Sequence, residues 1–349
     1  MNKIVKEDLE NLINNNKFLY DELDNTTVLV TGASGLIGSY IVNSILMYDR
    51  QFNKNIKVIA LVHSKNKADI IFNDYLDSGL LDIYECDICD KINIDEKIDY
   101  IIHGASITSS KMFVERPVDV IKTAIIGTMN VLGLAVKNNI KSFVYMSSIE
   151  AYGIFNDSIL KEIKEDELGN LDITNVRSSY PESKRMVENL VISYASQYNI
   201  DAKIVRLTQT FSAGIDYKDN RVFAEFSRCI VENKNLVLHS KGETTKNFCY
   251  TVDAVLAIFY VLLKGVNKEI YNVASDNSII STYDLAKLMI EVSKSNVELI
   301  VKNDENSSMG YFPTFKAYLN TDKLKKLGWS SKYSIKDMVE RLIEYMRNL

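Results

Sequence analysis

Residues 27–46 read TVLVTGASGLIGSYIVNSIL, and this stretch decides the fold. It opens with a run of β-branched and apolar residues typical of a buried strand, and it closes with a helical pattern of apolar residues. The turn between them, GASGLIG, carries Gly32, Gly35 and Gly38. Glycines placed there allow a tight turn, close approach of backbone N–H groups to a pyrophosphate, and close packing of helix against strand. The stretch therefore predicts a phosphate-binding turn at a helix N-terminus, whose partial positive charge favours an anion.

The alternation of strand-like and helical segments continues beyond this turn. Further runs rich in β-branched and apolar residues stand at 57–62, 100–103, 142–146 and 202–207, with helical patterns between them. Such alternation is the signature of βαβ units, and right-handed crossovers then favour a doubly wound parallel sheet. We therefore predict an α/β protein with a Rossmann-type dinucleotide-binding domain over residues 26–208.

The pattern changes after Thr208, where longer polar connections separate the helical segments 222–231 and 282–293. Residues 209–349 are therefore predicted to form a smaller C-terminal lobe that binds the substrate. The apolar segment 252–264 is expected to return to the large domain as a buried helix, so the two parts are interleaved rather than separated by a single boundary.

The first 25 residues, 1–25, are acidic and rich in asparagine, and apolar residues at helical spacing predict a helical extension. They lack the basic start and apolar stretch of a secretory signal. The four cysteines of the chain are therefore expected to be reduced thiols in the cytoplasm. The most apolar run, 254–263, is far shorter than the roughly 20 residues of a membrane span, so no membrane partner is expected.

The bulk composition excludes several classes of protein. With 349 residues, 46% of them hydrophobic and 25% charged, the chain can bury a large core. The net charge of -5 and the absence of a long Lys/Arg block argue against a nucleic-acid partner. Cys86 and Cys89 form a CxxC pair, but only three histidines and no second pair are present to complete a four-ligand zinc site. We favour a turn at a strand end over a metal site, so no metal is expected.

A second motif carries candidate catalytic groups. Residues 180–184 read YPESK, in which Tyr180 and Lys184 stand four residues apart and therefore share one face of a helix. A free phenol with a pKa near 10 is a poor base at neutral pH, but a nearby ammonium and a positive nicotinamide ring stabilise the phenolate. Upstream, residues 146–153 read MSSIEAYG at the end of an expected strand, which brings Ser148 toward the same cleft.

These segments resemble those of the extended short-chain dehydrogenases/reductases, the NAD-dependent epimerase/dehydratase family of nucleotide-sugar-modifying enzymes. The GxxGxxG spacing, the YxxxK helix start and the SSxxxYG segment are motifs of that family. The similarity extends from Thr26 to about Trp329 and includes HGAS at 103–106, RLTQT at 206–210, GETTKNF at 242–248 and the segment 321–329. It implies a nucleotide-diphosphate-sugar substrate, a chemistry that starts by oxidising C4 of the sugar, and a homodimer.

The resemblance also implies three sets of site residues. The catalytic set consists of Ser148, Glu150, Tyr180 and Lys184. The cofactor-binding set consists of Gly32, Ser34, Gly35, Leu36, Ile37, Gly38, His63, Ser64, Lys65, Asp87, Ile88, Gly104, Ala105, Ser106, Tyr180 and Lys184. The substrate-binding set consists of Thr108, Ser148, Gln209, Arg221, Val222 and Lys246.

Several positions depart from the pattern of the family. Lys246 stands where relatives carry an arginine, which keeps the charge but loses the bidentate fork. Gln209 replaces the usual asparagine of its strand, and Ala124 replaces another before Gly127. Residues 310–314, GYFPT, stand where UDP-glucuronate decarboxylases have an arginine that assists catalysis. The absence of that arginine argues against decarboxylation.

The second expected strand leaves the choice between NAD and NADP open. It runs into His63, Ser64 and Lys65 without the acidic residue that accepts a hydrogen bond from a ribose 2′-hydroxyl. These residues, with Lys67, fit a 2′-phosphate or a solvated polar loop equally well. We therefore expect NAD or NADP, with a slight preference for NADP.

Glu150 decides between the reactions open to such an enzyme. It occupies the position of the glutamate that removes the C5 proton in sugar-nucleotide 4,6-dehydratases, where 4-epimerases usually carry a small neutral residue. The preceding Ile149 departs from the Asp-Glu pair of dTDP-glucose dehydratases, although GDP-mannose dehydratases also lack that aspartate. An exposed or ion-paired carboxylate is the alternative explanation. We favour a 4,6-dehydratase over a 4-epimerase, and retention of the serine, tyrosine and lysine argues against a non-catalytic dinucleotide sensor.

Overall fold

The computed structural model describes residues 1–155, 159–302 and 314–349, and its centre is a seven-stranded parallel sheet. The strand order is β12-β7-β5-β4-β1-β2-β3, so consecutive strands run outward from β1 in both directions. This confirms the α/β, Rossmann-type fold predicted from the sequence. The strands are β1 (Thr27–Thr31), β2 (Lys57–Val62), β3 (Leu81–Glu85), β4 (Tyr100–His103), β5 (Ser142–Ser148), β7 (Ala202–Leu207) and β12 (Ile270–Val273).

Two strands of the sheet were not predicted, and both lie at its edges. β3 reads LDIYE and buries only its first residue completely, so it lacks the apolar run that marks an internal strand. β12 reads IYNV and is too short to stand out after the apolar helix before it. β5 is longer than the predicted segment 142–146 because it continues through Ser147 and Ser148, which therefore belong to the sheet.

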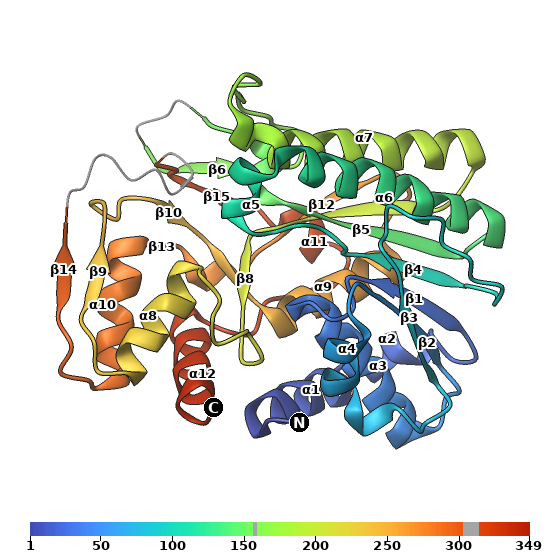
Figure 1. The fold of residues 1–349 in the computed structure, drawn as a ribbon, viewed down its shortest axis with the longest axis horizontal. Coiled ribbons are helices and arrows are strands. Elements are labelled where there is room, and N and C mark those ends of the chain that lie inside the picture. The colour runs from blue at the N-terminus through green and yellow to red at the C-terminus, as the bar shows by residue number, and fades with distance from the viewer. Residues whose placement is uncertain (156–158, 303–313) are drawn as a thin grey trace.

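Helices cover both faces of this sheet, as Figure 1 shows. On one face lie α1 (Lys3–Asn15), α2 (Lys17–Asp21), α3 (Leu36–Phe52) and α9 (Thr251–Lys264). On the other face α6 (Pro117–Asn138) packs along α7 (Ser179–Tyr198). Successive side chains of β1 point to opposite faces of the sheet and so reach both layers. Val28 and Val30 pack into the core on the α3 side, and Leu29 packs into the core on the α6 side.

Helix α6 is long and apolar enough to cross a membrane, judged by length and composition alone. In the structure it buries eight of its residues between α7 and the sheet. Its outer surface nevertheless carries exposed apolar side chains, namely Val118, Ile121, Ile126 and Met129.

The remainder of the chain forms a smaller group of helices and short strands beyond the carboxyl edge of the sheet, at the left of Figure 1. Helix α12 (Ile335–Arg347) packs on α8 (Val222–Val231) and on α10 (Thr282–Ser293). Helix α9 contacts β5, β7 and α3, so this segment lies against the large sheet. The shorter strands are β6 (Lys161–Ile163), β8 (Gln209–Phe211), β9 (Leu236–Leu238), β10 (Thr245–Lys246), β11 (Phe248–Tyr250), β13 (Ile280–Ser281), β14 (Leu299–Val301) and β15 (Ala317–Leu319). Three short helices contact the large sheet or its helices instead: α4 (Lys65–Ile71) contacts β3, α5 (Ser110–Glu115) contacts α6, and α11 (Asp322–Lys325) contacts β12.

The N-terminal helix α1 is tied to both parts of the molecule through one buried carboxylate. Asp8 is fully buried and accepts hydrogen bonds from the hydroxyls of Tyr40 on α3, at 3.2 Å, and of Tyr250 on β11, at 2.7 Å. Its other oxygen lies 2.8 Å from the guanidinium of Arg341 on α12. Burial raises the pKa of the Asp8 carboxyl, and these hydroxyls and the guanidinium oppose that shift.

Candidate active site

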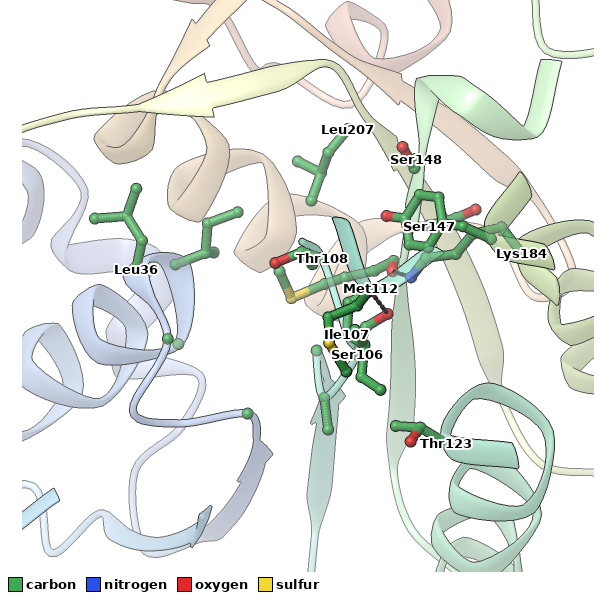
Figure 2. Close-up of a pocket in the computed structure, with 18 of the residues that line it drawn as sticks. Leu36, Ser106, Ile107, Thr108, Met112, Thr123, Ser147, Ser148, Lys184 and Leu207 are labelled. Atoms are coloured by element: carbon green, nitrogen blue, oxygen red, sulfur yellow. Dashed lines mark hydrogen bonds between the residues drawn. The ribbon is translucent and has the colours of Figure 1, made fainter. Parts of the chain in front are cut away.

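A cavity of about 1020 Å³ follows the carboxyl ends of the central strands, the place where open α/β sheets bind ligands. It extends from the turn after β1, past the ends of β2, β4 and β5, to the start of α7 and to β10. Figure 2 shows Leu36 on one side of this cavity and Ser148 and Lys184 on the other. The glycine-rich turn and the YxxxK helix therefore line one continuous space.

The three glycines of the first turn have three different structural roles. Gly32 has a positive φ of 68°, which a side chain would strain, and a Cβ on Gly38 would lie 2.3 Å from the carbonyl oxygen of Gly32. Gly35 is the N-cap of α3 and carries no side chain to cover the first amides of that helix. Gly35 and the neighbouring Ser34 line the cavity. The bare helix N-terminus fits the pyrophosphate of a dinucleotide.

The loop after β4 lies directly beside the first turn and lines the same part of the cavity. Gly104, Ala105 and Ser106 all line it, and the hydroxyl of Thr31 accepts hydrogen bonds from the amides of Gly104 and Ala105, each at 3.2 Å. The preceding His103 is fully enclosed between the hydroxyls of Thr31, at 2.6 Å, and Thr128, at 2.9 Å. Burial lowers the pKa of the His103 imidazole to about 3.

At the end of β2 the predicted cofactor residues separate into two groups. His63 lines the cavity together with Asp87 and Ile88, and Lys67, also considered for a 2′-phosphate, lines it as well. Ser64 and Lys65 do not: Ser64 accepts the amide of Lys67 as the N-cap of α4, and the Lys65 ammonium pairs with Asp69 at 2.7 Å. The first half of α6 also lines the cavity, through Asp119, Lys122 and Thr123, and was not predicted because it belongs to no motif.

Ser148, Tyr180 and Lys184 meet at the far end of the cavity. Ser148 is the last residue of β5, and Tyr180 is the second residue of α7. The ammonium of Lys184 donates to the carbonyl oxygen of Met146 at 2.9 Å and lies 5.6 Å from the centre of the Tyr180 ring. Burial lowers the pKa of the Lys184 ammonium to about 8, while the carboxylates of Glu188 and Glu150 oppose this shift.

The Tyr180 ring is held by packing. It stacks on Phe113 with ring centres 4.3 Å apart and an angle of 10° between the planes, and Ser179 donates to the carbonyl oxygen of Phe113 at 3.1 Å. Burial raises the pKa of the Tyr180 phenol, and the charge of Glu150 adds to this effect. A hydrogen bond with Ser148 acts in the opposite direction. Positive charge beside the phenol is therefore required to make it a useful base.

Glu150 lies close to Ser148, because it belongs to the 3₁₀ turn Ile149–Tyr152 and Ser148 is the N-cap of that turn. Its amide donates to the Ser148 hydroxyl at 3.2 Å, and its side chain lines the cavity. Its carboxylate forms two bonds with the guanidinium of Arg177, at 2.8 and 3.1 Å. Nothing in the motifs of the sequence shows that Glu150 and Arg177 meet, because they lie 27 residues apart and only the fold brings their side chains together.

Four of the predicted substrate residues, Thr108, Gln209, Arg221 and Lys246, line the same cavity. Val222 does not line it and packs instead against the core at the start of α8. Burial lowers the pKa of the Lys246 ammonium to about 8, and the charge of Glu150 acts in the opposite direction. Of the segment 310–314, the residues 310–313 lie outside the described parts of the chain. Phe315, which follows it, lines the cavity and was not predicted.

Comparisons with known proteins give the following similarities. The sequence model of the NAD dependent epimerase/dehydratase family matches residues 28–274. The chain is 27% identical over 337 residues to UDP-glucuronic acid decarboxylase 6 of Arabidopsis thaliana, which covers 96% of this chain and 92% of that protein. It is 29% identical over 333 residues to dTDP-D-glucose 4,6-dehydratase of Homo sapiens, covering 92% and 89%. A solved UDP-glucose 4-epimerase from Thermotoga maritima superposes with a TM-score of 0.78 at 24% identity, over 92% of this chain and 99% of that one.

Proposed function

Because the chain belongs to the NAD-dependent epimerase/dehydratase family, a family of nucleotide-sugar-modifying enzymes, we propose that it is a nucleotide-diphosphate-sugar 4,6-dehydratase. The observation that carries this proposal is the position of Glu150. Glu150 lines the cavity two residues beyond Ser148, and the charge of its carboxylate acts on Tyr180, Lys184 and Lys246, which line the same cavity. A carboxylate at that place serves as a base for a second carbon of the sugar, which C4 oxidation alone does not need.

In the first step the protein removes the proton of the sugar 4-hydroxyl. Ser148 and Tyr180 receive that hydroxyl at the end of β5, and the Tyr180 phenolate accepts the proton as the C4–H bond breaks. Lys184, whose ammonium lies beside the Tyr180 ring, stabilises the phenolate by its charge. A nicotinamide dinucleotide, which the turn after β1 and Lys184 would hold, would supply the redox chemistry by taking up the hydride from C4 and giving it back at C6.

In the second step Glu150 accepts the proton from C5, which the new 4-keto group has made acidic. The C6 hydroxyl then leaves as water, which requires one proton. In the overall balance this proton replaces the one that Tyr180 took from O4. A proton returned to C5 then completes the 6-deoxy-4-keto sugar. The net change is the loss of one water molecule, with no net oxidation.

The test of the proposed function is turnover of a nucleotide-diphosphate sugar in deuterium oxide. Solvent deuterium at C5 of a 6-deoxy-4-keto product supports dehydration, and Glu150→Gln should stop the reaction after C4 oxidation. A C4 epimer without deuterium on any carbon would replace the proposal by 4-epimerisation. The ion pair of Glu150 with Arg177 is the observation that favours this second candidate, because a paired carboxylate also serves a purely structural role.

We further infer a preference for NADP over NAD. His63 and Lys67 both face the cavity at the end of β2, at the position where NAD-specific sites carry an acidic residue. Titration of the parent protein with the two dinucleotides tests the preference, which fails if NAD binds at least as tightly. Lys67→Ala should weaken NADP binding more than NAD binding.

We also propose that two copies of the chain associate through α6. Four apolar side chains, Val118, Ile121, Ile126 and Met129, stand exposed on the outer side of this helix, with exposed fractions of 58%, 44%, 42% and 45%. Exposed apolar side chains gathered on one helix are typical of an interface between subunits. The homodimer that the family resemblance implies would cover them.

A further inference from the structure

We propose that Arg177 is a positioning residue for proton transfer at C5, holding the Glu150 carboxylate at one point of the cavity wall. Both terminal nitrogens of Arg177 bind the Glu150 carboxylate, so the arginine acts on the reaction through that carboxylate. The inference rests on the proposed role of Glu150 as the C5 base, and it adds a residue that the motifs of the chain do not assign.

The contact between the two side chains is a bidentate ion pair. Nη1 of Arg177 lies 2.8 Å from Oε2 of Glu150, and Nη2 lies 3.1 Å from Oε1. The arginine side chain is 10% exposed and the glutamate side chain 24% exposed, so solvent screens the pair less than it screens a surface pair. Two parallel bonds fix the plane of the carboxylate as well as its distance.

Arg177 is itself held by its surroundings. It lies in the 3₁₀ turn Val176–Ser178, and its amide donates to the side chain of Asn175 at 3.0 Å. Its guanidinium lies 5.5 Å from the centre of the Phe113 ring, and Phe113 stacks on Tyr180. Phe113 therefore contacts both the guanidinium that binds Glu150 and the ring of Tyr180. Packing around this ring helps to set the spacing between the base proposed for C5 and the base proposed for O4.

The bidentate ion pair with Arg177 leaves the Glu150 carboxylate with free acceptor positions for a proton. An ionised carboxylate offers about four acceptor positions, and two bonds from the guanidinium leave the others free. The charge of Glu150 also acts on Tyr180, Lys184 and Lys246, which face it from α7 and β10. A displacement of a reacting group by about 1 Å can cost about 100-fold in rate, so the position matters as much as the charge.

The experiment compares four variants of the full chain with the parent: Arg177→Met, Arg177→Lys, Glu150→Gln and the double variant Arg177→Met/Glu150→Gln. The substrate is a nucleotide-diphosphate hexose that the parent turns over, in deuterium oxide. Three quantities are measured separately, namely the rate at which reduced nicotinamide absorbance appears, the rate of deuterium incorporation at C5, and the dissociation constant of the dinucleotide. Thermal unfolding of each variant reports whether the fold is retained.

For Arg177→Met we expect C5 exchange to slow by about 10- to 100-fold, and by more than C4 oxidation, while dinucleotide binding stays near the parent value. A smaller loss of C4 oxidation is expected because the charge of Arg177 also lowers the pKa of the Tyr180 phenol. Reduced nicotinamide should then persist, because the intermediate waits for the second step. Arg177→Lys keeps the charge but loses the fork, so it should recover part of the exchange rate. In the Glu150→Gln background, Arg177→Met should cause no further loss, since the arginine acts through that carboxylate.

Parent-like exchange in both arginine variants would overturn the inference, and so would an equal loss of C4 oxidation and C5 exchange. If Arg177→Met does not fold, the smaller change expected for Arg177→Lys carries the test. Failure of the proposed function has a different signature: the parent itself would show no C5 exchange, or C5 exchange would survive in Glu150→Gln whatever the arginine variants do.

Discussion

At the scale of single residues, Tyr180 is the group on which C4 oxidation depends. Tyr180→Phe removes the proton acceptor but keeps the ring that stacks on Phe113 at 4.3 Å. We expect C4 oxidation to fall by about 100-fold to 10,000-fold with dinucleotide binding nearly unchanged, which is the usual range for loss of a general base. Single-turnover formation of reduced nicotinamide measures the effect. Retention of most of the parent rate would show that another group takes the proton.

His103 gives a second residue-scale prediction, which concerns stability. The folded-state pKa of its imidazole is about 3, below the 6.5 of an unfolded chain, so the unfolded chain binds the proton first as the pH falls. Its contribution is therefore complete above about pH 6.5 and is lost progressively below it. From about pH 7 to about pH 5 the parent should lose about 2 kcal/mol more unfolding free energy than His103→Gln. Urea unfolding of both proteins at the two pH values checks this, and equal losses would contradict it.

Individual residues also show what the sequence could predict at the site. Ser148, Tyr180 and Lys184 belong to local motifs at the end of a strand and the start of a helix, and the structure brings all three into one cavity. Arg177 and Glu150 are 27 residues apart, and only the fold brings their side chains together. Lys65 was placed near the cofactor by its position after β2, but the first turn of α4 directs its ammonium to Asp69.

At the scale of elements, the turn between β1 and α3 contains one glycine that dinucleotide binding requires and another that the stability of the fold requires. A side chain at Gly35 would enter the cavity at the helix N-terminus, where a pyrophosphate must approach. Gly35→Val should therefore abolish dinucleotide binding, measured by calorimetric titration, with a modest effect on thermal unfolding. Binding of NAD or NADP at parent affinity would contradict this placement.

Gly38 provides the matched comparison within the same turn. A Cβ there would lie 2.3 Å from the Gly32 oxygen and 2.9 Å from the Cα of Ala33, both backbone atoms. Gly38→Ala should therefore lower the unfolding temperature more than Gly35→Val does, because the helix must move away from the strand. The opposite order of stabilities would show that the two glycines have been assigned the wrong roles.

The elements found from the sequence are those with a strong apolar pattern. The segments 27–30, 57–62, 100–103, 142–146 and 202–207 all form central strands because both of their faces are buried. The edge strand β3 lacked that signal because only its first residue is buried, and β12 lacked it because it is only four residues long. The wall contributed by α6 could not be foreseen either, because the path of a helix over the sheet is set by packing.

At the scale of the whole molecule, the exposed apolar side of α6 predicts the oligomeric state. The parent is expected to be a dimer by light scattering after gel filtration, and Ile121→Asp combined with Met129→Asp should make it a monomer. Ile70→Asp is the matched control, because this isoleucine of α4 is 80% exposed and lies on another helix. A parent monomer, or a dimer that persists in the double variant, would exclude this face.

The contacts of Asp8 bear on how the chain tolerates truncation. A shortened protein that begins at Thr26 would lose the acceptor shared by Tyr40, Tyr250 and Arg341, leaving two enclosed hydroxyls and a guanidinium without it. It would also uncover the apolar surfaces of α3 and α9 that α1 covers. Such a protein should aggregate when expressed, even though the cavity residues remain present. Helix α1 is thus expected to keep the protein from aggregating, because it covers these apolar surfaces.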